Sequence, residues 1–233
     1  MAAGNVVIVG GTQGLGRELA QSYTDGGYDV VVTGRDQARA DAAANEIGGR
    51  TRGIAFDLAD PHSIAGQLAD VGQVDYLALA AIERDVNNVR EYDIDSALRL
   101  VTLKLVGYTE VIHTLIPRLS HNSAILIYGG LARDRPYPGS TTVTTVNGGV
   151  TSLVRTLVSE LAPTRVNALH PAIVGDSPQW RDMPDERLQA LVQRTPIGRL
   201  VTMAEVVSAS RFLLENEAIN GINLTVDGGW TCV

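Results

Sequence analysis

The stretch of residues 5–19 constrains the fold most, because a buried-strand pattern runs through a glycine-rich turn into a helical pattern. Residues 6–9 (VVIV) are consecutive β-branched side chains, which is typical of a parallel strand covered on both faces. Gly10, Gly14 and Gly16 follow, and without a Cβ they let the chain turn tightly and bring its N–H groups close to a pyrophosphate. The N-terminus of the next helix would add free amides and the positive end of its dipole. The stretch therefore predicts a dinucleotide-binding turn.

Length and composition exclude several classes of protein. The chain has 233 residues, enough for one α/β domain with a sizeable core, and we expect a single domain over residues 1–233. Its 19 Lys and Arg residues are outnumbered by 26 Asp and Glu residues, without a basic run, so no nucleic-acid partner is expected. The single Cys232 and the absence of a His, Cys and carboxylate cluster predict no metal. No apolar run is long enough to span a bilayer, so we expect no membrane partner and a cytoplasmic location.

The second predicted strand, residues 28–33, bears on cofactor choice. An NAD site usually places a carboxylate about 20 residues beyond the glycines to accept the ribose 2′-OH. Here the strand leads into Arg35, whose guanidinium would pair with a 2′-phosphate, so NADP(H) is the expected cofactor. The next residue, Asp36, is interpreted as the N-cap of the following helix. The alternative for Arg35 is a solvated loop residue.

Strand and helix patterns alternate along the rest of the chain. Further strands are predicted at residues 52–56, 74–80, 124–128 and 165–170, with long helices at 94–119 and 141–161. A last helix and strand precede the C-terminus. The alternation implies an α/β fold: a single-domain, Rossmann-like, doubly wound parallel sheet of about seven strands with helices on both faces. The polar segment 176–194 is interpreted as a lid over a substrate.

Three motifs in order along about nine tenths of the chain resemble the short-chain dehydrogenase/reductase family. They are the Gly-x-x-x-Gly-x-Gly turn at residues 10–16, Asp57-Leu58 after the third strand, and Val-Asp-Gly-Gly at 226–229. The resemblance implies an NADP(H) site, with Asp57 and Leu58 at the adenine and the backbone after Pro171 at the nicotinamide. The implied cofactor-binding residues are Gly10, Thr12, Gln13, Gly14, Leu15, Gly16, Arg35, Asp57, Leu58, Ala80, Ala81, Pro171 and Ile173.

The family's catalytic residues are not carried over. Its members reduce a carbonyl by hydride transfer while a tyrosine, aided by a lysine four residues later, a serine and an asparagine, donates the proton. The chain can be aligned with the family pattern at Pro117, at Pro138-Gly139 and at Glu160. In this alignment Gly129 stands at the position of the serine, Val143 at the tyrosine, Asn147 at the lysine and Lys104 at the asparagine. We therefore predict an atypical active site.

Four residues are candidates for the missing chemistry: Lys104, Asn147, His170 and Tyr128. Lys104 is the only lysine in the chain and lies in the apolar run 100–106, where its amine either reaches solvent or faces a polar cavity. Unlike arginine, a desolvated lysine can lose its proton. His170 could titrate near neutrality, or be a hydrogen-bonded structural residue. Tyr128 should point away from the face that Gly129 opens.

Residues of two loops are open to a second interpretation. Glu83, Arg84 and Asp85 follow the fourth strand, and Tyr137 lies in the loop before the helix at 141–161. We interpret them as solvated, with the mouth of a substrate site as the alternative.

Three functions fit these observations. The first is an NADPH-dependent oxidoreductase that transfers hydride to a small-molecule carbonyl, imine or polarised C=C with a non-standard proton donor. The second is a non-redox enzyme of the same fold, a cyclase or dehydratase, and the third is an inactive, NADP(H)-binding regulatory protein. The helices at 94–119 and 141–161 are apolar on more than one face, so a homodimer or homotetramer is expected.

Overall fold

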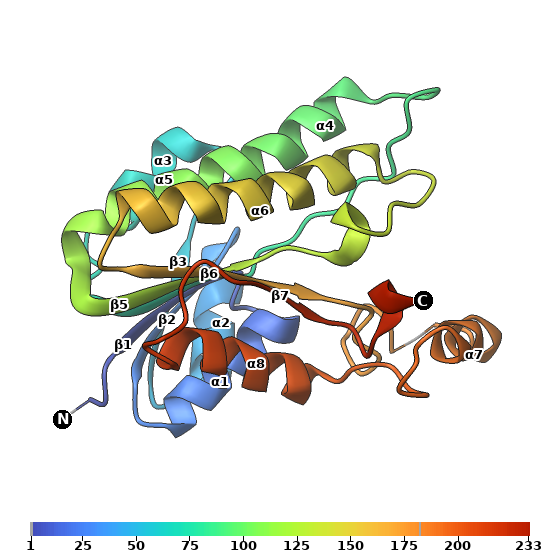
Figure 1. Ribbon diagram of the computed structural model, residues 1–233. Helices are drawn as coiled ribbons and strands as arrows, with labels where there is room; N and C mark the ends of the chain where they lie inside the picture. Colours follow the sequence, from blue (N-terminus) through green and yellow to red (C-terminus); the bar gives the residue numbers. More distant parts are fainter. Residues whose placement is uncertain (1, 182) are drawn as a thin grey trace.

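A computed structural model describes residues 2–181 and 183–233 and shows one seven-stranded parallel sheet (Figure 1). The strands are β1 (Asn5–Val9), β2 (Asp29–Gly34), β3 (Arg50–Ala55), β4 (Val74–Leu79), β5 (Leu119–Tyr128), β6 (Arg165–Pro171) and β7 (Asn223–Val226). Their order in the sheet is β3-β2-β1-β4-β5-β6-β7. The order reverses between β1 and β4, and in such sheets a crevice opens at the carboxyl ends of these two strands. The predicted fold class is confirmed.

Helices cover both faces of the sheet (Figure 1). On one face lie α1 (Gly14–Asp25), α2 (Gln37–Ile47) and α8 (Met203–Glu215), and on the other α3 (Pro61–Gln67), α4 (Ile94–Val101), α5 (Tyr108–Leu115) and α6 (Thr141–Glu160). The short α7 (Asp185–Gln193) lies apart from both layers, beside the C-terminus. It falls within the segment predicted to form a lid.

The core explains the composition of β1. Val7 and Val9 join the apolar cluster beneath α5 and α6, whereas Val6 and Ile8 join the cluster beneath α1 and α8. Both faces of the strand are therefore buried, and each face needs an apolar, β-branched side chain. Apart from β5, the strands lie close to their predicted positions, as does the start of α2. Asp36 accepts a hydrogen bond from the Arg39 N–H at 2.9 Å, which confirms it as the N-cap.

The predicted helix at 94–119 is wrong in two respects. Between α4 and α5 the chain forms a π-helical segment, Thr102–Gly107, that contains Lys104. After α5 comes a 3₁₀ turn, Ile116–Arg118, and β5 then begins at Leu119 rather than at residue 124. Pro117 ends the regular helix because it has no N–H to donate. The π-helical segment gives the same run of apolar letters as an α-helix, so hydrophobic spacing does not reveal it.

None of the helices among the described residues has the length and hydropathy to cross a membrane. Nor do residues 2–181 and 183–233 contain a group of three or more His, Cys, Asp or Glu side chains that could hold a metal ion.

Candidate active site

A cavity of about 1190 Å³ lies at the carboxyl ends of the strands. It exceeds the roughly 300–1,000 Å³ of an ordinary small-molecule pocket, so it has room for a dinucleotide and a second molecule. All the residues predicted to hold the cofactor line this cavity, together with Lys104, Val143 and Asn147. One cavity therefore contains the predicted glycine turn, the residues expected at the two ends of the cofactor, and the candidate amine.

The glycine turn has the geometry that a pyrophosphate needs. Gly10 has φ +83°, and a Cβ on it would lie 2.5 Å from the Ala81 backbone. A Cβ on Gly16 would lie 2.3 Å from the Gly10 carbonyl oxygen, so α1 packs directly against the turn. Gly14, with φ +55°, faces open space, and the N-cap Gln13 makes no side-chain bond to the first turn of α1. The first-turn amides are therefore free for an anionic ligand, and the residues present fit a dinucleotide.

The adenosine end contains two arginines and an ion-pair network. Arg35 is largely exposed, and Arg39, which sequence reasoning did not single out, also lines the cavity one helical turn later. Asp57, predicted to face the adenine, accepts a hydrogen bond from Arg99 Nη2 at 3.1 Å, while Arg99 Nε donates to Glu83 at 3.0 Å. Arg99 comes from α4, 42 residues from Asp57, and no motif marks it. The network fixes Asp57 at the cavity wall.

The Lys104 side chain extends from the π-helical segment and is buried beside Ala81, just after β4. Its Nζ lies 3.1 Å from Tyr108 Oη and 3.5 Å from the Ala81 carbonyl oxygen, and the Tyr108 hydroxyl donates to that same carbonyl. No carboxylate among the described residues contacts the amine, and burial lowers the pKa of Lys104 from 10.5 to about 7. The site thus contains an amine that can give up or take up a proton near neutrality.

Asn147 lies across the same cavity on α6. Its side chain is buried, and its Nδ2 would lie 3.0 Å from a Cβ on Gly130. Among the described residues its amide makes no side-chain hydrogen bond, whereas its backbone carbonyl accepts from Thr151. Val143, one turn earlier, presents only an apolar side chain. The amide is therefore available to a molecule in the cavity.

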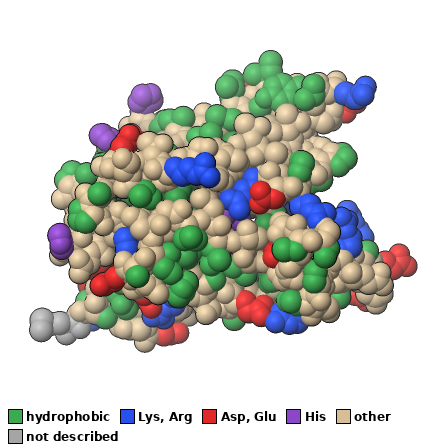
Figure 2. Space-filling model, viewed as in Figure 1, with side chains coloured by type: hydrophobic (Ala, Val, Ile, Leu, Met, Phe, Trp, Pro, Cys, Tyr) green, Lys and Arg blue, Asp and Glu red, His purple; other side chains and the backbone are tan. Residues whose placement is uncertain are grey.

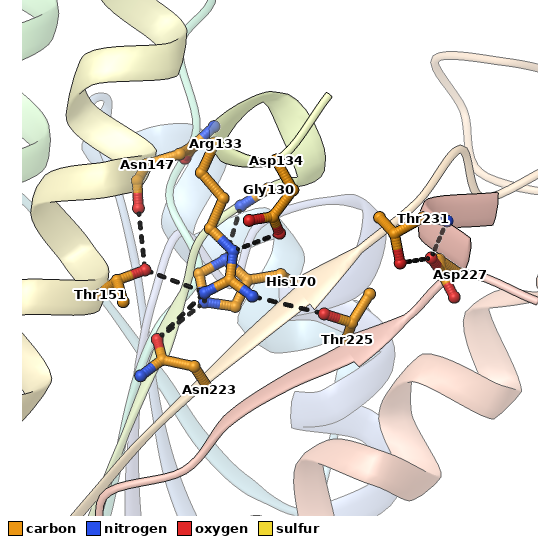
Figure 3. Close-up of polar contacts among 10 residues, drawn as sticks. All are labelled: Gly130, Arg133, Asp134, Asn147, Thr151, His170, Asn223, Thr225, Asp227 and Thr231. Atoms are coloured by element: carbon orange, nitrogen blue, oxygen red, sulfur yellow. Dashed lines mark hydrogen bonds and ion pairs between the residues drawn. The ribbon is translucent and has the colours of Figure 1, made fainter. Parts of the chain in front are cut away.

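His170 does not line this cavity, and its surroundings favour the structural interpretation over titration near neutrality. The side chain is fully buried, and burial, with Arg133 beside it, lowers its pKa to about 4. Gly130 N–H donates to Nδ1 at 3.1 Å, and Nε2 lies 3.0 Å from Asn223 Oδ1 and 2.9 Å from Arg133 Nη1 (Figure 3). Arg133 reaches the same cluster from the loop after β5 and donates to Thr151 on α6. These contacts match the structural alternative for His170.

The imidazole occupies space at Gly129. A Cβ on Gly129 would lie 2.2 Å from His170 Nδ1 and 2.4 Å from Cε1, distances that no side chain tolerates. In the register inferred from the sequence, Gly129 stands at the family's serine. The glycine is therefore required by the histidine behind it.

Tyr128 points to the opposite side of the sheet, as predicted. Its phenol lies 2.6 Å from Ser210 Oγ on α8, and burial raises its pKa to about 12. Such a group holds its proton at neutral pH and already has a partner. The geometry gives Tyr128 no part in proton transfer.

Three of the four loop residues, Glu83, Arg84 and Tyr137, line the cavity, which matches the alternative of a substrate mouth. Asp85 does not line it, and its carboxylate oxygens are buried without a hydrogen-bond partner among the described residues, so it is not a solvated residue. Trp180, in the predicted lid, lines the cavity as well, and the Arg84 guanidinium lies 5.5 Å from the centre of the Trp180 ring. Residues far apart in sequence thus form the mouth. Position 182, also in the lid segment, lies outside the described residues.

The strand order, the glycine turn and the cavity together define a Rossmann-type, dinucleotide-binding class of protein. A family model described as Enoyl-(Acyl carrier protein) reductase matches residues 9–231. The 3-oxoacyl-[acyl-carrier-protein] reductase of Homo sapiens is 30% identical over 233 residues, with 95% of each chain covered. The chain belongs to the short-chain dehydrogenase/reductase family.

Solved structures agree with this assignment. The 3-ketoacyl-(acyl-carrier-protein) reductase from Brucella melitensis, complexed with NADH, superposes with a TM-score of 0.87 at 27% identity and covers 99% of both chains. The MalC Reductase/Diels-Alderase from Malbranchea aurantiaca has a TM-score of 0.92 at 22% identity, over 100% of this chain and 98% of that one. At that identity the likeness concerns the fold.

Proposed function

We propose that the protein is an NADPH-dependent oxidoreductase that reduces a carbonyl, an imine or a polarised C=C bond of a small molecule. The observation that carries the proposal is the position of Lys104, a buried amine in the wall of the cavity that also contains the glycine turn. The relatives in the same family are named reductases, which supports the redox class. The bound cofactor would supply hydride to the electrophilic carbon.

The chain's own groups then have separate tasks. Ammonium Nζ of Lys104 donates a proton to the substrate oxygen or nitrogen as that atom gains the electron pair of the reduced double bond, and the neutral amine later recovers a proton from water. Tyr108 and the Ala81 carbonyl accept hydrogen bonds from the ammonium and hold it in place. Asn147 donates its free amide N–H to the same substrate atom. For a C=C bond, the proton goes to the carbon next to the activating group.

An NADPH-oxidation screen tests the proposal. The protein is mixed with NADPH and a panel of aldehydes, ketones, cyclic imines and α,β-unsaturated carbonyls, and absorbance at the nicotinamide band is followed. Oxidation of NADPH with equimolar reduced product is the expected result. Product formation without NADPH consumption would favour a non-redox enzyme. Tight NADPH binding without any product would favour a regulatory protein.

Arg35 should decide the choice between the two nicotinamide cofactors. A hydrogen bond between charged partners contributes roughly 1.5–3 kcal/mol, so Arg35→Ala should weaken NADPH binding about tenfold to a hundredfold and leave NADH binding nearly unchanged. Titration calorimetry with both cofactors gives the two dissociation constants. Arg39→Ala, on the same cavity wall, serves as a comparison and should show a smaller loss of the same kind. An equal loss for NADPH and NADH would contradict the assignment.

We also propose that the protein assembles as at least a dimer through α4, α5 and α6. Ile94 and Leu98 on α4 are exposed by 63% and 60%, and Val106 is half exposed further along the same layer. Sedimentation at micromolar concentration should show a dimer or tetramer, and Leu98→Asp should shift it towards monomer. Phe212→Asp, on α8 across the sheet, should keep at least a dimer. A monomeric parent protein would exclude this assembly.

A further inference from the structure

Four arginines line the mouth of the cavity, and none of them forms an ion pair with a carboxylate among the described residues. Arg84, Arg135, Arg187 and Arg194 line it, and they come from the loop after β4, the loop after β5, α7 and the segment after α7. The acidic lining residues are Asp36, Asp57 and Glu83, of which Glu83 and Asp57 both bind Arg99 at the adenosine end. Figure 2 shows Lys and Arg side chains gathered at the recess between the upper helical layer and the part of the molecule below it, with an Asp or Glu side chain beside them.

Trp230 brings two of these arginines together. The Arg194 Cζ lies 5.6 Å from the centre of the Trp230 ring, and Arg135 Nη2 donates to the Trp230 carbonyl oxygen at 3.1 Å. Across the mouth, Arg84 lies over Trp180 in the same way. A guanidinium that rests on an aromatic ring keeps its N–H groups directed outwards, away from the ring face. Two guanidinium groups held by one tryptophan therefore present donors to the same space.

These arginines lack counter-ions within residues 2–181 and 183–233. None of the ion pairs there involves Arg84, Arg135, Arg187 or Arg194. The nearby Asp85 carboxylate does not line the cavity. The chain has a net charge of −7, yet these four lining arginines have no ion-pair partner among the described residues. Like charges held together repel, and an anion between them relieves that repulsion.

We propose that the substrate carries an anionic group, a carboxylate or a phosphate, which Arg135 and Arg194 bind beside Trp230. Arg84 contributes from the side of Trp180. The proposal rests on the proposed function, because it names the substrate class of the same site. The anion would anchor one end of the molecule at the mouth while its reducible bond lies further in, between Lys104 and Asn147. Charged, bidentate donors of this kind recognise carboxylates and phosphates alike.

Intrinsic fluorescence provides a direct test that needs no turnover. The chain has two tryptophans, Trp180 and Trp230, and both line this cavity. Protein saturated with NADP⁺ is titrated with hexanoate, hexyl phosphate and hexan-1-ol. We expect saturable binding of at least one anion, about tenfold or more tighter than the alcohol and weakened by salt. The tighter of the two anions identifies the chemical group.

Variants locate the site. Arg194→Gln should weaken binding of the preferred anion about tenfold to a hundredfold, and Arg135→Gln should act in the same direction. Arg155→Gln, an exposed arginine on α6 outside the cavity, is the matched control and should leave binding unchanged. Far-UV circular dichroism checks that each variant is folded.

Three results would overturn the proposal: no saturable binding of either anion, equal affinity for the alcohol, or anion affinity that Arg194→Gln leaves unchanged. The proposed reductase function fails on different grounds, because it requires NADPH oxidation. Anion binding without NADPH oxidation would leave the anion site in place and remove the redox proposal.

Discussion

Lys104→Met should lower kcat/KM for the reduction about a hundredfold to ten-thousandfold, which is the usual contribution of a positioned general acid. Methionine fills a similar volume among apolar neighbours but cannot donate a proton. The dissociation constant of NADPH should change little, because the Lys104 amine bonds to Tyr108 and the Ala81 carbonyl oxygen and not to the glycine turn or Arg35. Stopped-flow hydride transfer and calorimetric NADPH binding, measured on the same preparations, separate the two effects.

The pH profile identifies the acid. Reduction needs the ammonium form, and burial lowers the pKa of Lys104 to about 7, so kcat/KM of the parent protein should fall as the pH rises above about 7. The residual kcat/KM of Lys104→Met should not show this fall above about pH 7. A Lys104→Met variant that folds, binds NADPH and turns over at the parent rate would end the hypothesis. Lys104→Arg is the charge-preserving control, and it should stay slow because a guanidinium does not release its proton.

Stability gives an independent measure of the same group. Lys104 loses its proton near pH 7 when folded but near pH 10.5 when unfolded, so the unfolded chain binds more protons between these values. The free energy of unfolding should therefore rise with pH across that window, and the rise should be absent in Lys104→Met. Below about pH 7 both states are protonated, and Lys104 contributes no pH dependence. The difference between parent and variant isolates this residue from the tyrosines, whose unperturbed pKa is about 10.

The single elements that the sequence predicted correctly are specified locally. The strand at residues 6–9, the turn with Gly10 and Gly14, and the Asp36 cap each depend on neighbours a few residues away, so a short pattern specifies them. The π-helical segment at Lys104 was missed because its apolar letters fit an α-helix equally well. Arg99 was missed because its partner Asp57 is distant in sequence and only packing brings them together.

The mouth of the cavity could be predicted only in part, for the same reason. Arg84, Arg135 and Arg194 come from separate connections, and each alone looks like an ordinary surface charge. Their common feature is contact with Trp180 or Trp230, which only the fold reveals. For His170 the sequence left two interpretations open, and only its surroundings in the fold decide between them. Full burial and the adjacent Arg133 set its pKa, and neither is visible in one-dimensional spacing.

Gly129→Ala should be one of the most destabilising single changes in the protein. The new methyl would lie 2.2 Å from His170 Nδ1, and the ring cannot retreat because Gly130 N–H and Asn223 hold its two nitrogens. Overpacking of a filled core costs typically 1–3 kcal/mol, and we expect about 3 kcal/mol here by chemical denaturation. Gly66→Ala on α3, where a Cβ meets nothing within 4 Å, is the control and should be neutral or slightly stabilising.

A double-mutant cycle with His170→Ala tests the cause. His170→Ala alone should cost about 2–4 kcal/mol, because it leaves a cavity and an N–H without its acceptor. The double variant should be more stable than the sum of the two losses by about 2 kcal/mol, since the new methyl then enters the space that the ring has left. Additive losses would show that Gly129 is required by something other than the imidazole. The expected coupling means that a serine cannot occupy this position while His170 is present, so a hydrogen bond to the substrate oxygen must come from across the cavity, where Lys104 and Asn147 lie.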